Sequence, residues 1–478
     1  MSLAVLLWLA MGLPAGAAYF RRRRFSLGLA VLPLAGSLAL LGPWIISAYT
    51  GLRTSGAWWG LEAAVFGLIL GAIAELVLRT GKSPVPAVAE GTRPAFSPVR
   101  VFVGGAFVLG LAIWNIDTGL SFMTVWPPFQ WDGYATWLTV TKIIADCDSF
   151  PRHLFVPGGQ WEYPILMPTL LAWFRRTGEL GIHESTLSLS IIAAVLPLAA
   201  WSALWRKLGP TWAAAAVSSP LIVPQLLFWH YGAYADGMLV MLDIYALLLA
   251  MVGIRDNDRG YLLAGGLGFA AAVMTKNEGA LWVLSSGVFL GFYALEHKVR
   301  GLDAVKKIAL CTAPAIVFFF SWSGVCKMLG LSNDVIANGK LLGNGGDMGK
   351  RIGIILDGFA QVFAFGTCSF GGNSDRFDRF WQHTPLPLII PALILIPILA
   401  CGSISRRLVR LAVLMSGPAI FTLGMMFIYL VTPKPLEWHL GTSLNRVMMV
   451  VFAAIFSMIF FARSKPQLAA LPNPQASP

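Results

Sequence analysis

The chain of 478 residues is 57% hydrophobic and 12% charged, and its mean hydropathy is +0.71. Soluble globular proteins carry about 25% charged residues, so this composition excludes an ordinary soluble enzyme. The net charge of +12 is better explained by basic loops on the cytoplasmic side of a membrane than by nucleic-acid binding. The five cysteines form no CxxC pair and give no support to a metal cluster or a redox motif.

The first apolar run, 2–20, is followed by the arginines Arg21 to Arg24. A helix needs about 20 apolar residues to cross a bilayer, and Lys and Arg collect in cytoplasmic loops. The run is therefore predicted to span the membrane with the N-terminus outside. A cleaved signal peptide is disfavoured because its basic end would precede the apolar run. Two more spans and a basic linker complete an N-terminal unit at 1–100.

Further apolar runs alternate with basic loops through a predicted core at 101–462, which has a large outer loop at 118–183 and a second outer region at 330–384. The segment 164–174 is too short to span and is predicted to lie along the outer interface, and the segment 352–370 is predicted to do the same because both of its neighbouring loops are outside. The tail at 463–478 is predicted to be disordered and inside.

The fold class predicted from this pattern is an all-α polytopic membrane protein. About thirteen spans are expected, at 2–20, 25–48, 56–78, 101–118, 184–205, 211–230, 236–254, 260–275, 278–295, 305–329, 385–401, 411–431 and 445–462.

Ionisable side chains gather at the predicted outer ends of the spans, where such groups are costly and mark candidate functional sites. Asp132 and Lys142 lie in the first outer loop, Tyr163 precedes the interfacial helix, and Asp236 begins a span. Asp243 follows Asp236 by seven residues, so it is expected on the same helix face but deeper in the bundle.

Two further outer positions carry charge. Lys276 and Glu278 lie in the turn between 260–275 and 278–295, where a simple ion pair that closes the turn explains them equally well. His439, Ser443 and Arg446 are spaced i, i+4, i+7 and share one helix face. Arg446 alone is compatible with a membrane-surface anchor, but its neighbours on that face favour a phosphate site.

These groups suit a lipid-linked anionic substrate, and a polyprenyl phosphate is the natural candidate. Arg446, His439 and Lys276 are predicted to hold its phosphate, with the arginine fork able to bind it bidentately. Transfer of a sugar with inversion needs a carboxylate that accepts the proton of the acceptor hydroxyl. Asp132 is the preferred base, and the nearest alternatives are Asp146, Asp148 and Glu162.

The order of these features resembles the GT-C superfamily of polytopic glycosyltransferases that use lipid-phosphate sugars. In particular, it resembles bacterial members related to protein O-mannosyltransferases, aminoarabinose transferases and lipopolysaccharide galacturonosyltransferases. Asp132 in the sequence Trp-Asp-Gly-Tyr looks like the essential acid near the start of that family's large outer loop, where it is a catalytic base or, in some branches, a metal ligand.

Four shorter segments support the resemblance. Tyr163-Pro164 is similar to the family's Tyr/Lys-Pro-Pro segment, although Ile165 replaces the second proline. Tyr234-Ala235-Asp236 looks like the acid that begins a later span. The segment 275–279 is similar to the Thr-Lys turn whose lysine faces the donor phosphate, and the segment 438–446 resembles a signature at the start of the last span.

The resemblance implies an inverting hexosyl- or pentosyltransferase of the cytoplasmic membrane. It would transfer a sugar from a polyprenyl-phosphate donor to an envelope lipid, glycan or protein acceptor on the outer face. Tyr163, Asp236, Glu278, Lys142 and Ser443 are expected to line the donor site with the three phosphate-binding residues. The only cofactor that the family suggests is a divalent cation, and Gly133 stands where the family often has a second acid, which argues against a metal site there.

Three other functions stay open. A transporter of a polyprenyl-linked glycan predicts internal repeats and charges at the membrane midplane, and the sequence shows neither. A non-catalytic protein of polysaccharide assembly would need none of the predicted site residues for chemistry. A polysaccharide ligase would use His439 and Arg446 at an undecaprenyl diphosphate, with Asp132 incidental.

Overall fold

The computed structural model describes residues 1–54, 56–80, 97–125, 133–152, 155, 161–222, 233–331, 348–365, 404–432 and 434–463. These residues form helices and turns and no strand, apart from one isolated bridge between Arg53 and Ser149. The helices, in chain order, are α1 (Ser2–Met11), α2 (Leu13–Phe20), α3 (Phe25–Thr50), α4 (Gly56–Thr80), α5 (Pro98–Val125), η2 (Gly133–Leu138), α6 (Thr139–Asp146), α7 (Leu166–Gly178), η4 (Glu184–Thr186), α8 (Leu187–Leu208), α9 (Pro210–Ile222), α11 (Ala235–Arg255), α12 (Arg259–Val273), α13 (Glu278–Glu296), α14 (Gly301–Met328), α16 (Met348–Phe365), α19 (Ile404–Val431) and α20 (Leu436–Arg463).

Nine of the described helices are long and apolar enough to cross a membrane, namely α3, α4, α5, α8, α11, α13, α14, α19 and α20. They match nine of the predicted spans. The bent pair α1 and α2 covers the predicted span 2–20 and makes a tenth if it crosses as one unit. The prediction of an all-helical membrane protein is therefore confirmed for the described residues, whereas a bundle of thirteen spans is not.

The three remaining predicted spans differ in their outcome. The span 260–275 is the helix α12, whose 15 residues make it shorter than the nine spanning helices. The span 211–230 begins as α9, but its residues beyond Ile222 lie outside the described part of the chain, as do 385–401. The predicted interfacial helix 352–370 begins earlier, as α16, and it is not among the nine.

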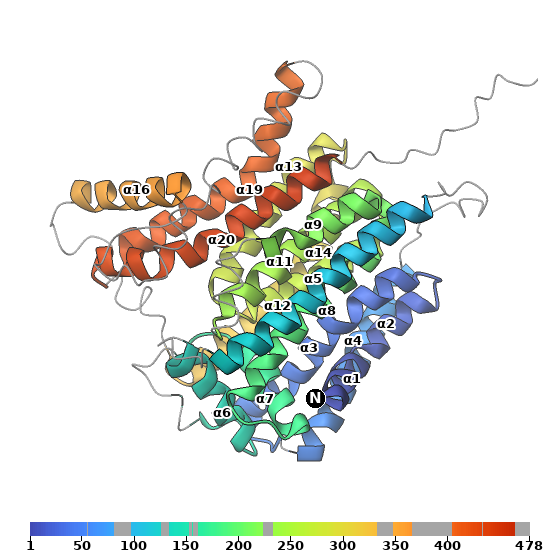
Figure 1. The fold of residues 1–478 in the computed structure, drawn as a ribbon, viewed down its shortest axis with the longest axis vertical. Helices are drawn as coiled ribbons and strands as arrows, with labels where there is room; N and C mark the ends of the chain where they lie inside the picture. Colours follow the sequence, from blue (N-terminus) through green and yellow to red (C-terminus); the bar gives the residue numbers. More distant parts are fainter. Residues whose placement is uncertain are drawn as a thin grey trace, which may run out of the picture.

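The break between α1 and α2 bends the pair by 58° and lies at Gly12. A side chain is excluded there, because a Cβ atom on Gly12 would lie 2.1 Å from the carbonyl oxygen of Leu32 in α3. Pro14 then stands in the first turn of α2, where its missing N–H costs no helical hydrogen bond. Both α1 and α2 pack against α3, and the N-terminus lies near α7 (Figure 1).

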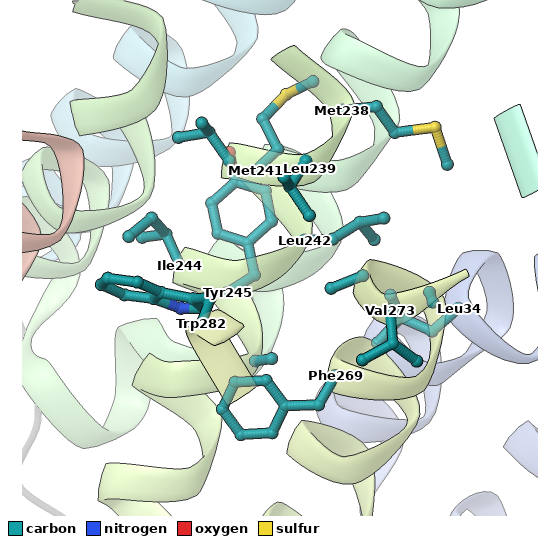
Figure 2. Packing of buried hydrophobic residues seen from close by; sticks show 14 of the residues in the cluster. Leu34, Met238, Leu239, Met241, Leu242, Ile244, Tyr245, Phe269, Val273 and Trp282 are labelled. Atoms are coloured by element: carbon teal, nitrogen blue, oxygen red, sulfur yellow. The ribbon is translucent and has the colours of Figure 1, made fainter. Parts of the chain in front are cut away.

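The centre of the bundle is α11, which is buried along its whole spanning length. Its neighbour α12 approaches closely through glycines, since a Cβ atom on Gly265 would lie 2.8 Å from the carbonyl oxygen of Ala246. Phe269 and Val273 of α12 and Trp282 of α13 pack in the same core around α11 (Figure 2). A short helix made of small residues can thus remain inside the protein without a lipid-facing surface.

Ion pairs gather the predicted cytoplasmic loops at one end of the bundle, here called the basic end. Arg24, between α2 and α3, pairs with Asp258, which caps the N-terminus of α12. Lys207, after α8, lies 2.7 Å from Asp256 in the turn after α11. The opposite end, where α11 and α20 begin, is called the site end below.

The helix α7 corresponds to the first predicted interfacial segment. It matches the predicted interfacial segment 164–174 and is too short to span, but all its residues from Leu166 to Phe174 are buried. It packs between α1, α3 and α6 near the lower end in Figure 1. Its apolar face is therefore covered by protein at the site end.

Candidate functional site

Four charged side chains meet at the site end, namely Asp236, Lys276, Glu278 and Arg446, and they are called the charge cluster below. Lys276 Nζ lies 2.8 Å from Asp236 Oδ1 and 3.1 Å from Glu278 Oε1. Arg446 Nη1 lies 3.7 Å from Asp236 Oδ2. All four were predicted site residues, and the structure brings them together from three separate parts of the chain.

Helix ends position these charges. Asp236 and Glu278 stand in the first turns of α11 and α13, where the helix dipole favours a negative charge. Lys276 occupies the tight turn between α12 and α13. The first turn of α13 packs closely against the end of α12 because residue 279 is a glycine: a Cβ atom there would lie 2.5 Å from the carbonyl oxygen of Ala272. The turn therefore places its cation between two helix N-termini.

Arg446 lies further along α20 and is held on two sides. Its Nε donates a hydrogen bond to the carbonyl oxygen of Thr442, and its guanidinium lies 4.6 Å from the ring centroid of Tyr234. A planar guanidinium over an aromatic face is a favourable arrangement that also fixes the plane of the fork. Tyr234 is thus part of the site, although only its neighbour Asp236 was predicted to be.

The charge cluster is electrically balanced, with two cations and two carboxylates. Burial opposes the charge on Lys276, but Asp236 and Glu278 outweigh it and raise the pKa of the amine above its ordinary value. Within the described residues, Asp236 Oδ2 and Glu278 Oε2 are buried without a hydrogen-bond partner. Lys276 therefore contacts both acids, while each acid keeps one oxygen without a hydrogen-bond partner among the described residues.

A second polar group adjoins the cluster where α19 ends and α20 begins. His439 Nδ1 and Thr432 Oγ1 share a hydrogen bond of 3.0 Å, and the His439 ring lies 4.9 Å from that of Tyr429. Ser443 Oγ donates to the carbonyl oxygen of His439. Because that bond uses its one proton, Ser443 must accept the 2.8 Å hydrogen bond of the Tyr429 hydroxyl.

Three of these positions were not predicted from the sequence. Tyr429 and Thr432 lie at the end of an apolar run, and Arg351 lies in α16, from which it donates hydrogen bonds of 3.2 and 3.1 Å to the carbonyl oxygens of Tyr429 and Thr432. No local motif marks any of them. They come together only in the folded protein, where Arg351 of α16 binds the last carbonyl oxygens of α19.

Tyr163 reaches the cluster from the large loop. It is half-buried, its ring lies 5.4 Å from that of Trp137, and it interacts electrostatically with Glu278, Lys276 and Arg446. Burial, aided by the charge of Glu278, raises the pKa of its hydroxyl. Its phenol is therefore a neutral group in the electrostatic surroundings of the cluster.

The remaining predicted residues do not join the cluster. Lys142 is exposed and pairs with Asp146 on its own helix at 3.5 Å. Asp146 also binds Arg175 at 2.9 Å, and Asp148 lies 3.7 Å from Arg176, so these two alternative bases are occupied by basic residues at the end of α7. The preferred base, Asp132, lies outside the described residues.

Asp243 lies one step deeper, as its spacing from Asp236 predicts. It is fully buried, and neither of its oxygens has a hydrogen-bond partner among the described residues. A buried polar group without a partner costs free energy, which makes Asp243 the least well accommodated side chain of α11.

A resident metal gains no support from these groups. In the described part of the chain, no three His, Cys, Asp or Glu side chains come together as metal ligands, and both carboxylates of the charge cluster bind Lys276. Comparisons with protein-family models, with curated proteins and with solved structures found no match.

Proposed function

We propose that this chain is a membrane glycosyltransferase that takes a sugar from a polyprenyl-phosphate donor and transfers it, with inversion, to an envelope acceptor at the outer face of the cytoplasmic membrane. The observation that carries the proposal is the convergence of Arg446, Lys276 and Asp236 at one end of a membrane bundle. A fixed fork of donors beside a buried lysine, with apolar helices beneath, suits a phosphate whose tail lies in lipid.

The balanced charge of the cluster suggests how a phosphate enters. Arg446 holds Asp236 only at 3.7 Å, beyond hydrogen-bond range, whereas Lys276 holds it at 2.8 Å. Arg446 is therefore the cation that exchanges its carboxylate for the phosphate. Lys276 stays bound to both acids and keeps the cluster assembled.

In the proposed reaction, Asp132 accepts the proton of the acceptor hydroxyl as that oxygen attacks the anomeric carbon. The bond from this carbon to the phosphate oxygen breaks, and the polyprenyl phosphate leaves with the electron pair. A phosphate leaving group needs positive charge more than a proton donor, and Arg446 supplies that charge. Tyr163 and Tyr234 border the same position and fix its shape.

The test compares the sugar composition of the cell envelope, by hydrolysis and mass spectrometry, at equal amounts of membrane protein. Asp132→Asn and Arg446→Met are expected to remove one sugar. Arg410→Met is the matched control, because Arg410 is also ion-paired, with Glu296 at 3.1 Å, but at the basic end. If both site variants keep the wild-type composition while a deletion strain changes it, the glycosyltransferase proposal is wrong.

A non-catalytic role in polysaccharide assembly is the second candidate, and the charge balance of the cluster favours it. Lys276 joins the N-termini of α11 and α13, which is also what a purely structural ion pair would do. In that case Arg446→Met lowers the amount of folded protein, and the envelope sugar follows protein amount alone.

A further inference from the structure

The end of α3 binds a segment of the large loop, Cys147–Arg152, through three polar contacts. The Phe150 amide donates a 2.9 Å hydrogen bond to Ser47 Oγ. The Thr54 amide donates to the carbonyl oxygen of Asp148 at 2.6 Å, and Arg152 Nε donates to that of Ala48 at 2.9 Å. The loop segment is thus fastened to α3 and to the turn that follows it.

Ser47 is the buried contact among these. Its side chain is fully covered, and its hydroxyl donates to the carbonyl oxygen of Leu52 at 2.6 Å while it accepts from Phe150. Gly51, at φ +75°, ends α3 in the left-handed region and turns the chain back so that Leu52 can accept this bond. One hydroxyl therefore joins the end of α3, the following turn and the loop segment.

Aromatic contacts continue from this segment toward the charge cluster. The Phe150 ring lies 4.6 Å from that of Phe155, which lies 5.4 Å from that of Trp161. Phe150 also packs against Trp322 of α14, whose Nε1 donates to the carbonyl oxygen of Glu162 at 2.9 Å. The residue that follows Glu162 is Tyr163, which interacts electrostatically with the charge cluster.

The far end of this path is fastened to the lysine turn. The Leu166 amide donates a 2.7 Å hydrogen bond to the carbonyl oxygen of Met274, two residues before Lys276. The loop is consequently held at α3 on one side and at the α12–α13 turn on the other, with Tyr163 between the two attachments.

We infer that α3 positions the loop side of the charge cluster, and that Ser47 is the positioning residue at its attachment point. This gives the N-terminal helices a role in the site although none of their residues belongs to the cluster. That the positioned site handles a sugar donor rests on the proposed function; the attachment itself does not.

Hydrogen exchange of the full-length protein in detergent, read by mass spectrometry, tests the attachment. Ser47→Ala leaves the Phe150 amide without its acceptor, so exchange in peptides covering 147–152 and 161–166 is expected to rise roughly fivefold, the value of one ordinary hydrogen bond. Ser37→Ala is the matched control. Ser37 is a second buried serine of α3, and it accepts from Trp8 Nε1 at 3.1 Å, away from the loop.

Envelope sugar composition is then measured for the same two variants at equal protein amounts. The inference expects Ser47→Ala to lose product together with loop protection, while Ser37→Ala changes neither. Unchanged exchange in Ser47→Ala would overturn the attachment. Faster exchange with full product, in a protein whose Arg446→Met variant loses product, would overturn the positioning role. Loss of loop protection in Ser47→Ala, combined with normal envelope sugar in Arg446→Met, would reject the proposed function while leaving the attachment intact.

Discussion

Lys276 and Asp236 are 40 residues apart in the chain, yet their side chains meet at 2.8 Å with both buried. The amine of Lys276 also binds Glu278, so a single cation contacts acidic residues in the first turns of two membrane helices. Each partner depends on the others, because an isolated charge in this surrounding is far more costly than a paired one. The following expectations begin with that dependence.

Lys276→Met is expected to lower the free energy of unfolding by about 3–5 kcal/mol, because it removes the cation that pairs with both Asp236 and Glu278. The double variant Lys276→Met with Asp236→Asn should recover part of this loss, since one of the two carboxylates that lost this partner is then neutral. Thermal unfolding in detergent measures both. A lysine variant as stable as the wild type would show that the pair contributes nothing.

Arg446→Lys separates charge from geometry. Lysine keeps the positive charge but loses the planar fork and its stacking on Tyr234, so product formation is expected to fall at least about tenfold with little change in stability. Arg351→Lys is the control, because Arg351 bonds the carbonyl oxygens at the end of α19 and not the cluster. Full activity of the Arg446→Lys variant would mean that the fork is not used.

Asp243→Leu is expected to stabilise the protein by about 1–3 kcal/mol, because it removes a buried polar group that has no partner among the described residues. Asp243→Asn keeps a polar group there and should gain much less. Thermal unfolding of the two variants gives the comparison. If Asp243→Leu unfolds more easily than the wild type, the carboxyl group makes a stabilising contact in the folded protein.

Asp256, in the turn between α11 and α12, gives a pH dependence at the basic end. Burial opposes its charge, but Arg255 and Lys207 outweigh this and lower its pKa. A carboxyl whose pKa is lowered by folding adds stability above its ordinary value of 3.8, and that contribution disappears as the pH falls through the lower folded value. The stability difference between wild type and Asp256→Asn should therefore be full at pH 6 and shrink below pH 4. A difference that does not change with pH would contradict this.

The alternation of apolar runs and basic loops was sufficient to predict most of the spanning helices, because lipid imposes length and hydropathy directly on the sequence. The run 260–275 forms α12, which extends from Asp258 at the basic end to the turn of Lys276 at the site end but, with 15 residues, is shorter than the nine spanning helices. Such a run has the same hydropathy whether it meets lipid or, like α12, the other helices of the bundle. Hydropathy does not distinguish these two kinds of burial.

Only part of the site could be predicted, because the sequence shows which residues are charged but not which residues they contact. Asp236, Lys276 and Arg446 could be identified because charge beside hydrocarbon is conspicuous in a sequence. The helix α20 begins nine residues before the predicted 445, since His439 and Ser443 are polar but have partners that let them lie inside a helix. Lys142 is also a positive charge in a predicted outer loop, but its ion-pair partner, Asp146, lies on its own helix and not in the charge cluster.

The ion pair of Arg24 with Asp258 joins residues 234 positions apart and has a consequence for biosynthesis. When ribosome and translocon have released α1, α2 and α3 into the bilayer, the ion-pair partner of Arg24 and α12, one of the helices that pack against α3, have not yet been made. Until α12 is synthesised, these first helices lack its packing contacts and the carboxylate that pairs with Arg24. The last-made half of the chain therefore completes the packing of the first, and truncation before residue 258 would strand an incomplete N-terminal unit in the membrane.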